Sequence, residues 1–105
     1  MSCRSDPRPW LLVARAYAQL DWWSDSVDRY LRAYRLDAGC RGDPQMLQDL
    51  VKAAAHPAAG RSAAKAIHDI YGAEAIPAVA SERDRRTGDR EAVARLDRLK
   101  EELSH

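Results

Sequence analysis

The segment WLLVARAYAQLDWWSDSVDRYLRAYRLDA, residues 10–38, decides the fold class of this chain. Its apolar residues recur every three to four positions on both sides of a short break, which is typical of amphipathic helices. A connection of only two or three residues forces the two helices to run antiparallel. The segment therefore predicts a helical hairpin. The predicted inward positions are Trp10, Val13, Ala14, Tyr17 and Leu20, followed by Trp23, Ser26, Val27, Tyr30, Ala33 and Tyr34.

The predicted turn of this hairpin carries two adjacent tryptophans. Ser24 is a suitable N-cap for the second helix, and a start at Asp21 satisfies the same rules. We expect Trp23 to pack back over the first helix, because burying an aromatic ring of this size contributes about 2–3 kcal/mol. Trp22 cannot face the same way. It is either covered by the N-terminus or exposed as a contact surface.

The helical period continues to the end of the chain, and no segment alternates with the period of a strand. The sequence therefore predicts an all-α fold of about six helices in three antiparallel hairpins, at residues 7–40, 43–71 and 72–103. The boundary signals after the first hairpin are Asp43 as an N-cap before Pro44, Pro57 as a stop, Gly72 as a C-terminal stop, Pro77 in a first turn, and Asp89 as an N-cap.

Residues 7–40 resemble a tetratricopeptide (TPR) repeat across its full 34 residues without a gap. Ala38 replaces the proline that usually closes the repeat, which leaves the exit from the second helix less sharply set. The matching positions are Trp10 for Trp, Val13 and Ala14 for the Leu-Gly pair, Tyr17 for Tyr, Ser26 for the first small residue, Tyr30 for Phe, and Ala33 for the second Ala.

The second half repeats with a shift of 29 residues, and the stretch IYGAEAIPAVASERDRRTGDREAVARLDRL, residues 70–99, resembles HEAT-like repeats. The hallmark is a Gly-containing turn followed by an apolar-Pro-Ala helix. Together the resemblances imply a short α-solenoid, a single domain spanning residues 1–105, in which each hairpin buries its apolar face against its neighbours. A plain helical bundle is the alternative, and the ends of the chain also suit a fragment of a larger protein. The charged face of the last helix, with Arg95 and Arg98, is expected to be a solvent-facing cap.

Composition sets limits on function. There are 17 Lys and Arg against 16 Asp and Glu, a net charge of +1, so no global field attracts nucleic acid or an anionic membrane. No run of 18 apolar residues predicts a membrane span, and the N-terminus lacks the apolar core of a secretory signal. Cys3 and Cys40 show no metal-binding spacing and are expected to be free thiols in a reducing compartment. The sequence therefore predicts a cytoplasmic location.

No catalytic constellation is evident. His56 precedes Pro57 at a predicted helix end, and His68 and Asp69 point about 100° apart on a helix, so we expect no pair between them. A Gly-rich phosphate loop and a nucleophile elbow are also missing. We expect a protein that is not an enzyme and that needs no cofactor or metal.

The TPR resemblance implies a concave groove lined by the first helix of each hairpin. Leu11 and Arg15 stand where chaperone-binding TPR proteins carry a Lys and an Asn that clamp a terminal carboxylate, so that clamp is absent here. An arginine in such a groove can still pair with acidic groups of a peptide. The resemblance thus implies an adaptor or regulatory domain that binds a partner protein or peptide. The groove candidates are Arg8, Leu11, Arg15, Gln19, Gln45, Gln48 and Lys52.

Two alternatives remain open at the sequence level. An apolar edge from Trp10 to Trp22 favours a structural homodimer. The second alternative is nucleic-acid binding at one helix–loop–helix edge, although neighbouring carboxylates dilute its charge. That edge contains Arg83, Arg85, Arg86 and Arg90, interspersed with Glu82, Asp84 and Asp89.

Overall fold

The computed structural model describes residues 6–105, so the prediction for Cys3 lies outside the described part. These residues form helices and no strand, and the all-α prediction is confirmed. Within them, no helix combines the length and the apolar character needed to cross a membrane. The elements in order are α1 (Arg8–Gln19), α2 (Trp23–Leu36), η2 (Ala38–Gly42), α3 (Pro44–Ala54), α4 (Gly60–Ile70), η3 (Gly72–Ala75), α5 (Ile76–Arg85) and α6 (Arg90–Leu103).

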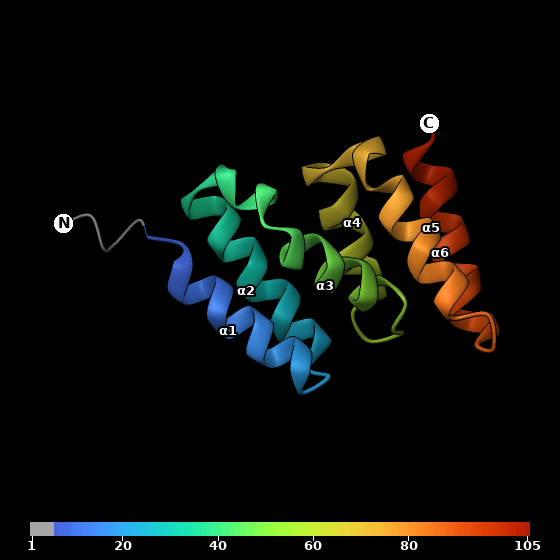
Figure 1. The fold of residues 1–105 in the computed structure, drawn as a ribbon, viewed down its shortest axis with the longest axis horizontal. Helices are drawn as coiled ribbons and strands as arrows, with labels where there is room; N and C mark the ends of the chain where they lie inside the picture. The colour runs from blue at the N-terminus through green and yellow to red at the C-terminus, as the bar shows by residue number, and fades with distance from the viewer. Residues whose placement is uncertain (1–5) are drawn as a thin grey trace.

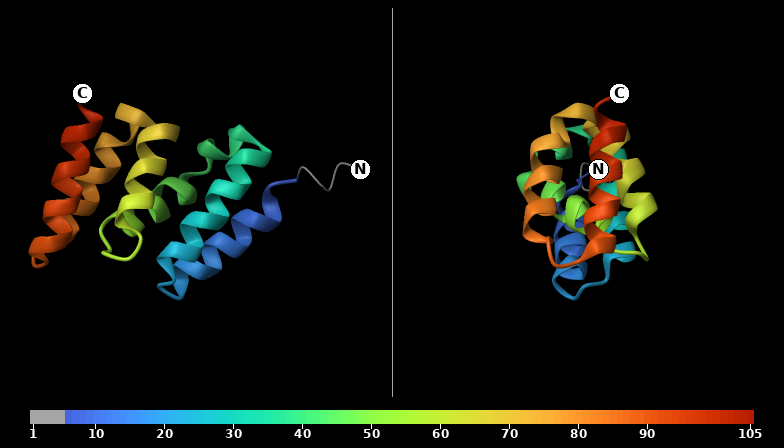
Figure 2. Two further views of the ribbon diagram at one scale, coloured as in Figure 1. Left: turned by 180° about the vertical axis from the view of Figure 1, so that it is seen from behind. Right: turned by 90° about the vertical axis from the view of Figure 1, so that its right-hand side faces the viewer.

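The helices are arranged in two layers along the long axis of an elongated molecule, which measures 47 × 30 × 18 Å (Figure 1). α1 packs along α2, α3 along α4, and α5 along α6. Seen nearly end-on, α1, α3 and α5 lie in one layer and α2, α4 and α6 in the other (Figure 2). Each inner helix therefore contacts both its partner in the other layer and its neighbours in its own.

Several helix boundaries lie where the sequence signals place them. The Asp43 carboxylate accepts a hydrogen bond from the Gln45 backbone N–H at 2.9 Å, and Asp89 accepts one from Ala92 at 3.1 Å. These side chains satisfy backbone donors that have no partner within the helix. Gly72 has φ of +59°, which glycine adopts without steric cost, and it follows the end of α4. The N-cap and stop predictions are confirmed at these positions.

The turn between α1 and α2 is closed by Asp21, which has a left-handed φ of +61°. The Asp21 N–H donates to Ala18 O at 3.1 Å and the Trp22 N–H to Tyr17 O at 2.9 Å. This pair of bonds is the Schellman pattern, in which the left-handed position is usually glycine. An aspartate in this conformation is uncommon, although it tolerates the region better than most residues.

The prediction of Ser24 as the N-cap of α2 is wrong. The helix begins at Trp23, and Trp22 occupies the N-cap position with no side-chain hydrogen bond. Ser24 already lies in the first turn, where its hydroxyl donates to Ala58 O at 3.4 Å. The left-handed residue reverses the chain so tightly that the helix starts two residues earlier than an N-cap at Ser24 would place it.

Small residues bring α1 and α2 together. Ala14 and Ser26 are both fully buried, and the Ser26 hydroxyl donates to Ala14 O at 2.8 Å across the interface. Two of the predicted inward positions on α1 are wrong, because Val13 is 40% and Leu20 is 58% exposed. Ala18 completes the buried face instead. α1 is the first helix of its layer, and no described element covers its outer side.

The core runs without interruption between the two layers from α1 to α6. Apolar side chains from every α-helix enter it. The largest fully buried apolar side chains are Tyr30, Met46, Leu50, Val51, Ile67, Val79, Leu96 and Leu99.

The left-handed conformation of Asp21 makes a stability prediction. Asp21→Gly and Asp21→Val remove the same charge, but only glycine enters this region without strain, so we expect the valine variant to be less stable by about 1–2 kcal/mol. Urea denaturation followed by circular dichroism measures the difference.

The same pair of substitutions at Asp25 is the control, because Asp25 lies in the first turn of α2, a regular helix. There, Asp25→Gly is expected to be no more stable than Asp25→Val, since glycine is the poorer helix former. Equal stabilities of the two Asp21 variants would contradict the role assigned to this turn.

Candidate functional site

A groove between α1 and α3 brings together four of the seven groove candidates. Arg15 and Gln19 from α1 and Gln45 and Lys52 from α3 line one cavity of about 430 Å³. Its remaining lining comes from Ala18, Trp23 and Asp49. The predicted residues thus meet at one place, on the layer formed by α1, α3 and α5.

The other three candidates do not line this cavity. Arg8 is exposed and ion-paired with Asp6 at 2.8 Å. Leu11 is partly buried and packs against the core. Gln48 is exposed on α3, outside the cavity lining. The spacing placed them correctly on helices but did not predict which of them reach the groove.

Arg15 is already committed to an internal ion pair. Its Nη2 donates to Asp43 Oδ2 at 2.5 Å, while the other oxygen of the same carboxylate caps α3 through the Gln45 backbone N–H. One carboxylate therefore both starts a helix and ties α1 to α3. Sequence reasoning identified Asp43 only as a cap, since the two partners are 28 residues apart.

The floor of the groove is a buried hydrogen-bond network. The Tyr30 hydroxyl donates to Asp49 Oδ2 at 2.5 Å, and Gln45 Nε2 donates to Asp49 Oδ1 at 2.9 Å. Asp49 is only 4% exposed. Burial and the bond to Asp49 raise the pKa of Tyr30, so the phenol keeps its proton. Asp49 is thus satisfied internally and is unsuited to receive a ligand.

One sequence signal could have revealed this network. Tyr30 occupies the position where the TPR pattern has an apolar phenylalanine, so its hydroxyl needs an acceptor inside the core. Asp49 is a carboxylate on an otherwise inward-facing stretch of α3. The pairing of the two follows once α2 and α3 are known to be neighbours.

Two N–H donors in the groove wall have no acceptor. Arg15 Nε and Trp23 Nε1 are buried without a hydrogen-bond partner among the described residues. Each such donor costs about 1–3 kcal/mol relative to a satisfied one. Trp23 also stacks on His56, with ring centroids 5.1 Å apart.

Trp22 is exposed. Of the two placements expected for this residue, covered by the N-terminus or exposed at the surface, the second is observed. Its side chain is 53% exposed and stacks on Tyr17 with ring centroids 5.5 Å apart. It borders a shallow cavity of about 520 Å³ together with Trp23, His56 and Asp25. Burial, reinforced by the positive charge of Arg86, lowers the pKa of His56. The imidazole is thereby favoured in its neutral form.

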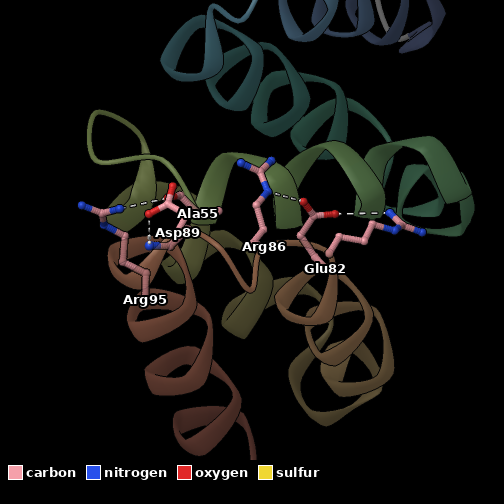
Figure 3. A network of polar contacts seen from close by, with 7 residues as sticks. Ala55, Glu82, Arg86, Asp89 and Arg95 are labelled. Atoms are coloured by element: carbon pink, nitrogen blue, oxygen red, sulfur yellow. Dashed lines mark hydrogen bonds and ion pairs between the residues drawn. The ribbon is translucent and has the colours of Figure 1, made fainter.

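The arginine edge considered for nucleic acid is largely neutralised by internal ion pairs. Glu82 is buried and accepts hydrogen bonds from Arg86 Nε at 2.7 Å and Arg85 Nη1 at 3.3 Å (Figure 3). Arg83 Nε donates to Asp97 Oδ1 at 2.9 Å. Of the four arginines, three are thus paired with carboxylates within residues 6–105. Such an arrangement gives little free charge for phosphate groups.

The expectation that His68 and Asp69 stay apart is wrong. His68 Nδ1 and Asp69 Oδ1 approach to 3.4 Å, and both side chains are more than half exposed. Asp69 also accepts a hydrogen bond from Lys65 at 2.8 Å. The contact is a surface interaction, without the burial that would orient a catalytic base. Across the described residues, no three His, Cys, Asp or Glu side chains gather as a metal site would require.

Comparisons of the chain with protein-family models, with curated proteins and with solved structures find no match.

The network beneath the groove makes a second stability prediction. Tyr30→Phe removes one of the two donors to the buried Asp49 carboxylate, and we expect a loss of about 1–3 kcal/mol in the free energy of unfolding. Tyr34→Phe is the matched control, because Tyr34 is partly buried on the same helix and its hydroxyl makes no hydrogen bond to any of residues 6–105. Chemical denaturation of both variants measures the difference. Equal small effects would show that the Tyr30 bond is dispensable.

Proposed function

We propose that this chain is a non-catalytic interaction module, an adaptor or regulatory domain that binds a partner protein or peptide through the groove between α1 and α3. In this proposal the chain is a short α-solenoid, TPR-like at residues 7–40 and HEAT-like at residues 43–103, and it acts in the cytoplasm. The two-layer order of the helices supports the solenoid, since stacked hairpins produce such layers. Solenoid scaffolds commonly present extended surfaces for partners.

The observation that carries the proposal is the convergence of Arg15, Gln19, Gln45 and Lys52 on one cavity. They come from two helices, α1 and α3.

The chemistry of the groove favours a partner that supplies acceptors. The Lys52 ammonium has no ion pair within residues 6–105, and the Gln19 amide is exposed beside it in the lining. These groups can bind carboxylates or backbone carbonyls of an extended peptide. Trp23 and Ala18 add apolar wall to the same groove.

Arg15→Glu is a poor test of this groove, because it also breaks the ion pair with Asp43. The better variant is Gln19→Glu with Lys52→Glu. It changes the net charge of the groove lining from positive to negative and leaves the hydrogen bonds of Asp49 to Tyr30 and Gln45 intact. A pull-down from lysate, with partners identified by mass spectrometry, is expected to show about tenfold lower recovery of a specific partner.

Arg35→Glu is the control, because Arg35 is exposed on α2 in the other layer. Its recovery of the partner is expected to equal that of the wild type. Recovery that is the same for all three proteins would remove the α1–α3 groove from the proposal.

A second candidate function, self-association, is favoured by apolar exposure on the outer side of α1 and its turn. Leu12 is 65%, Leu20 58% and Trp22 53% exposed. Apolar groups gathered at one edge often mark an interface. Sedimentation velocity from about 1 to 100 μM is expected to show a dimer that Leu12→Glu with Leu20→Glu abolishes. A strict monomer over this range would rule the candidate out.

A further inference from the structure

A second and larger groove lies between α4 and α6, in the layer opposite the α1–α3 groove. Its volume is about 830 Å³. The apolar part of its lining includes Ala54, Ala64 and Leu99. Neither the TPR resemblance nor the proposed function makes use of this surface.

The two helices line this groove with matching patterns. On each helix four of the lining residues follow the spacing i, i+3, i+4, i+7, which defines one helical face. Each set contains two cationic side chains and one small or apolar residue. The two sets are Arg61, Ala64, Lys65 and His68 on α4, and Arg95, Arg98, Leu99 and Glu102 on α6, and Gly60 and Asp69 of α4 also line the groove.

This placement adds to the expectation for the last helix. The sequence suggested that Arg95 and Arg98 belong to a solvent-facing cap; Arg98 is exposed as expected, and both also line the groove. Arg95 is partly buried, and its Nη1 donates to Ala55 O at 3.0 Å (Figure 3). The charged stripe of α6 therefore forms one wall of a cleft whose other wall is α4.

The charge of the groove is predominantly positive. Arg61, Lys65, Arg95 and Arg98 face only two carboxylates in the lining, those of Asp69 and Glu102. Lys65 is paired with Asp69 at 2.8 Å, and Arg95 lies 3.5 Å from Glu91. Arg61 and Arg98 have no ion pair in the described part of the chain, and they stand on opposite helices. Two guanidinium groups are thus free to receive anionic groups from an occupant.

We propose that the α4–α6 groove binds an acidic amphipathic segment of a partner protein. Apolar side chains of the segment lie on Ala64 and Pro57, which are apolar lining residues outside the buried core, while its carboxylates pair with Arg61 on one side and Arg98 on the other. Guanidinium groups suit this role because they bind carboxylates through two parallel hydrogen bonds. A helix laid into a groove by its apolar face is an established mode of peptide recognition.

The lining favours a peptide over nucleic acid. A phosphate backbone presents closely spaced negative charges that Lys and Arg neutralise, whereas Asp69 and Glu102 lie among the cations of this groove and would repel it. The apolar lining offers nothing to a phosphodiester chain but matches the leucine-type side chains of an amphipathic segment. The proposal goes beyond the proposed function, because it uses another layer, other residues and a partner of defined charge.

The test uses the full chain and a fluorescein-labelled peptide of about 14 residues, with leucine at helical spacing and glutamate at the other positions. Fluorescence anisotropy is expected to show saturable binding that weakens as salt is added, because exposed ion pairs are screened. Arg61→Glu with Arg98→Glu is expected to weaken binding by more than about tenfold. Circular dichroism confirms that the variant is folded.

Two controls make the result specific. Arg35→Glu with Arg90→Glu makes the same change in net charge outside the groove, and Lys52→Glu alters only the α1–α3 groove. Both are expected to bind the peptide as the wild type does. Loss of binding in the Lys52→Glu variant alone would place the peptide in the other groove and overturn the present inference without touching the proposed function.

Other outcomes also overturn it. One is the lack of saturation by about 1 mM peptide, and another is equal weakening in the charge-matched control. A third is stronger binding, through the same two arginines, of a single-stranded oligonucleotide or of vesicles rich in anionic lipid. A peptide with lysine in place of glutamate is expected not to bind.

Discussion

The buried hydrogen bond between Tyr30 and Asp49 is the contact on which the arrangement of the first three helices depends. A hydroxyl inside an apolar core is costly unless it finds an acceptor, and a buried carboxylate is costly unless it finds donors. Tyr30 and Asp49 solve both problems together and join α2 to α3. The ion pair of Arg15 with Asp43 adds a second tie, from α1. The two links fix the rotation of α3, which sets the direction of the side chains along the groove.

Much of the fold could be predicted from the sequence because helical periodicity and capping are local properties. Asp43 and Asp89 cap helices as expected. Val13 and Leu20 were misplaced, since periodicity shows which residues share a face but not whether a neighbour covers that face. The start of α2 was also misplaced, because Asp21 adopts a conformation in which the rules expect glycine.

The functional surfaces were less predictable, because they arise from residues far apart in the chain. Arg15 lines the α1–α3 groove, but its pairing with Asp43 depends on how α1 meets α3. The α4–α6 groove was missed for a related reason. Taken alone, the stripe of Arg95 and Arg98 resembles a solvated helix face, and it becomes the wall of a cleft only when α4 places Arg61 opposite.

The aromatic residues are distributed unevenly along the stack, and this has an optical consequence. Trp10, Trp22 and Trp23 all belong to α1, α2 or the turn between them, whereas residues 72–105 contain no Trp, Tyr or Phe. Tryptophan emission therefore reports the state of the N-terminal pair, and separation of α5 and α6 leaves it unchanged. Far-ultraviolet dichroism detects every helix equally. A difference between the two melting curves would measure how strongly the two ends of the stack are coupled, since successive helix pairs along a stack can unfold separately.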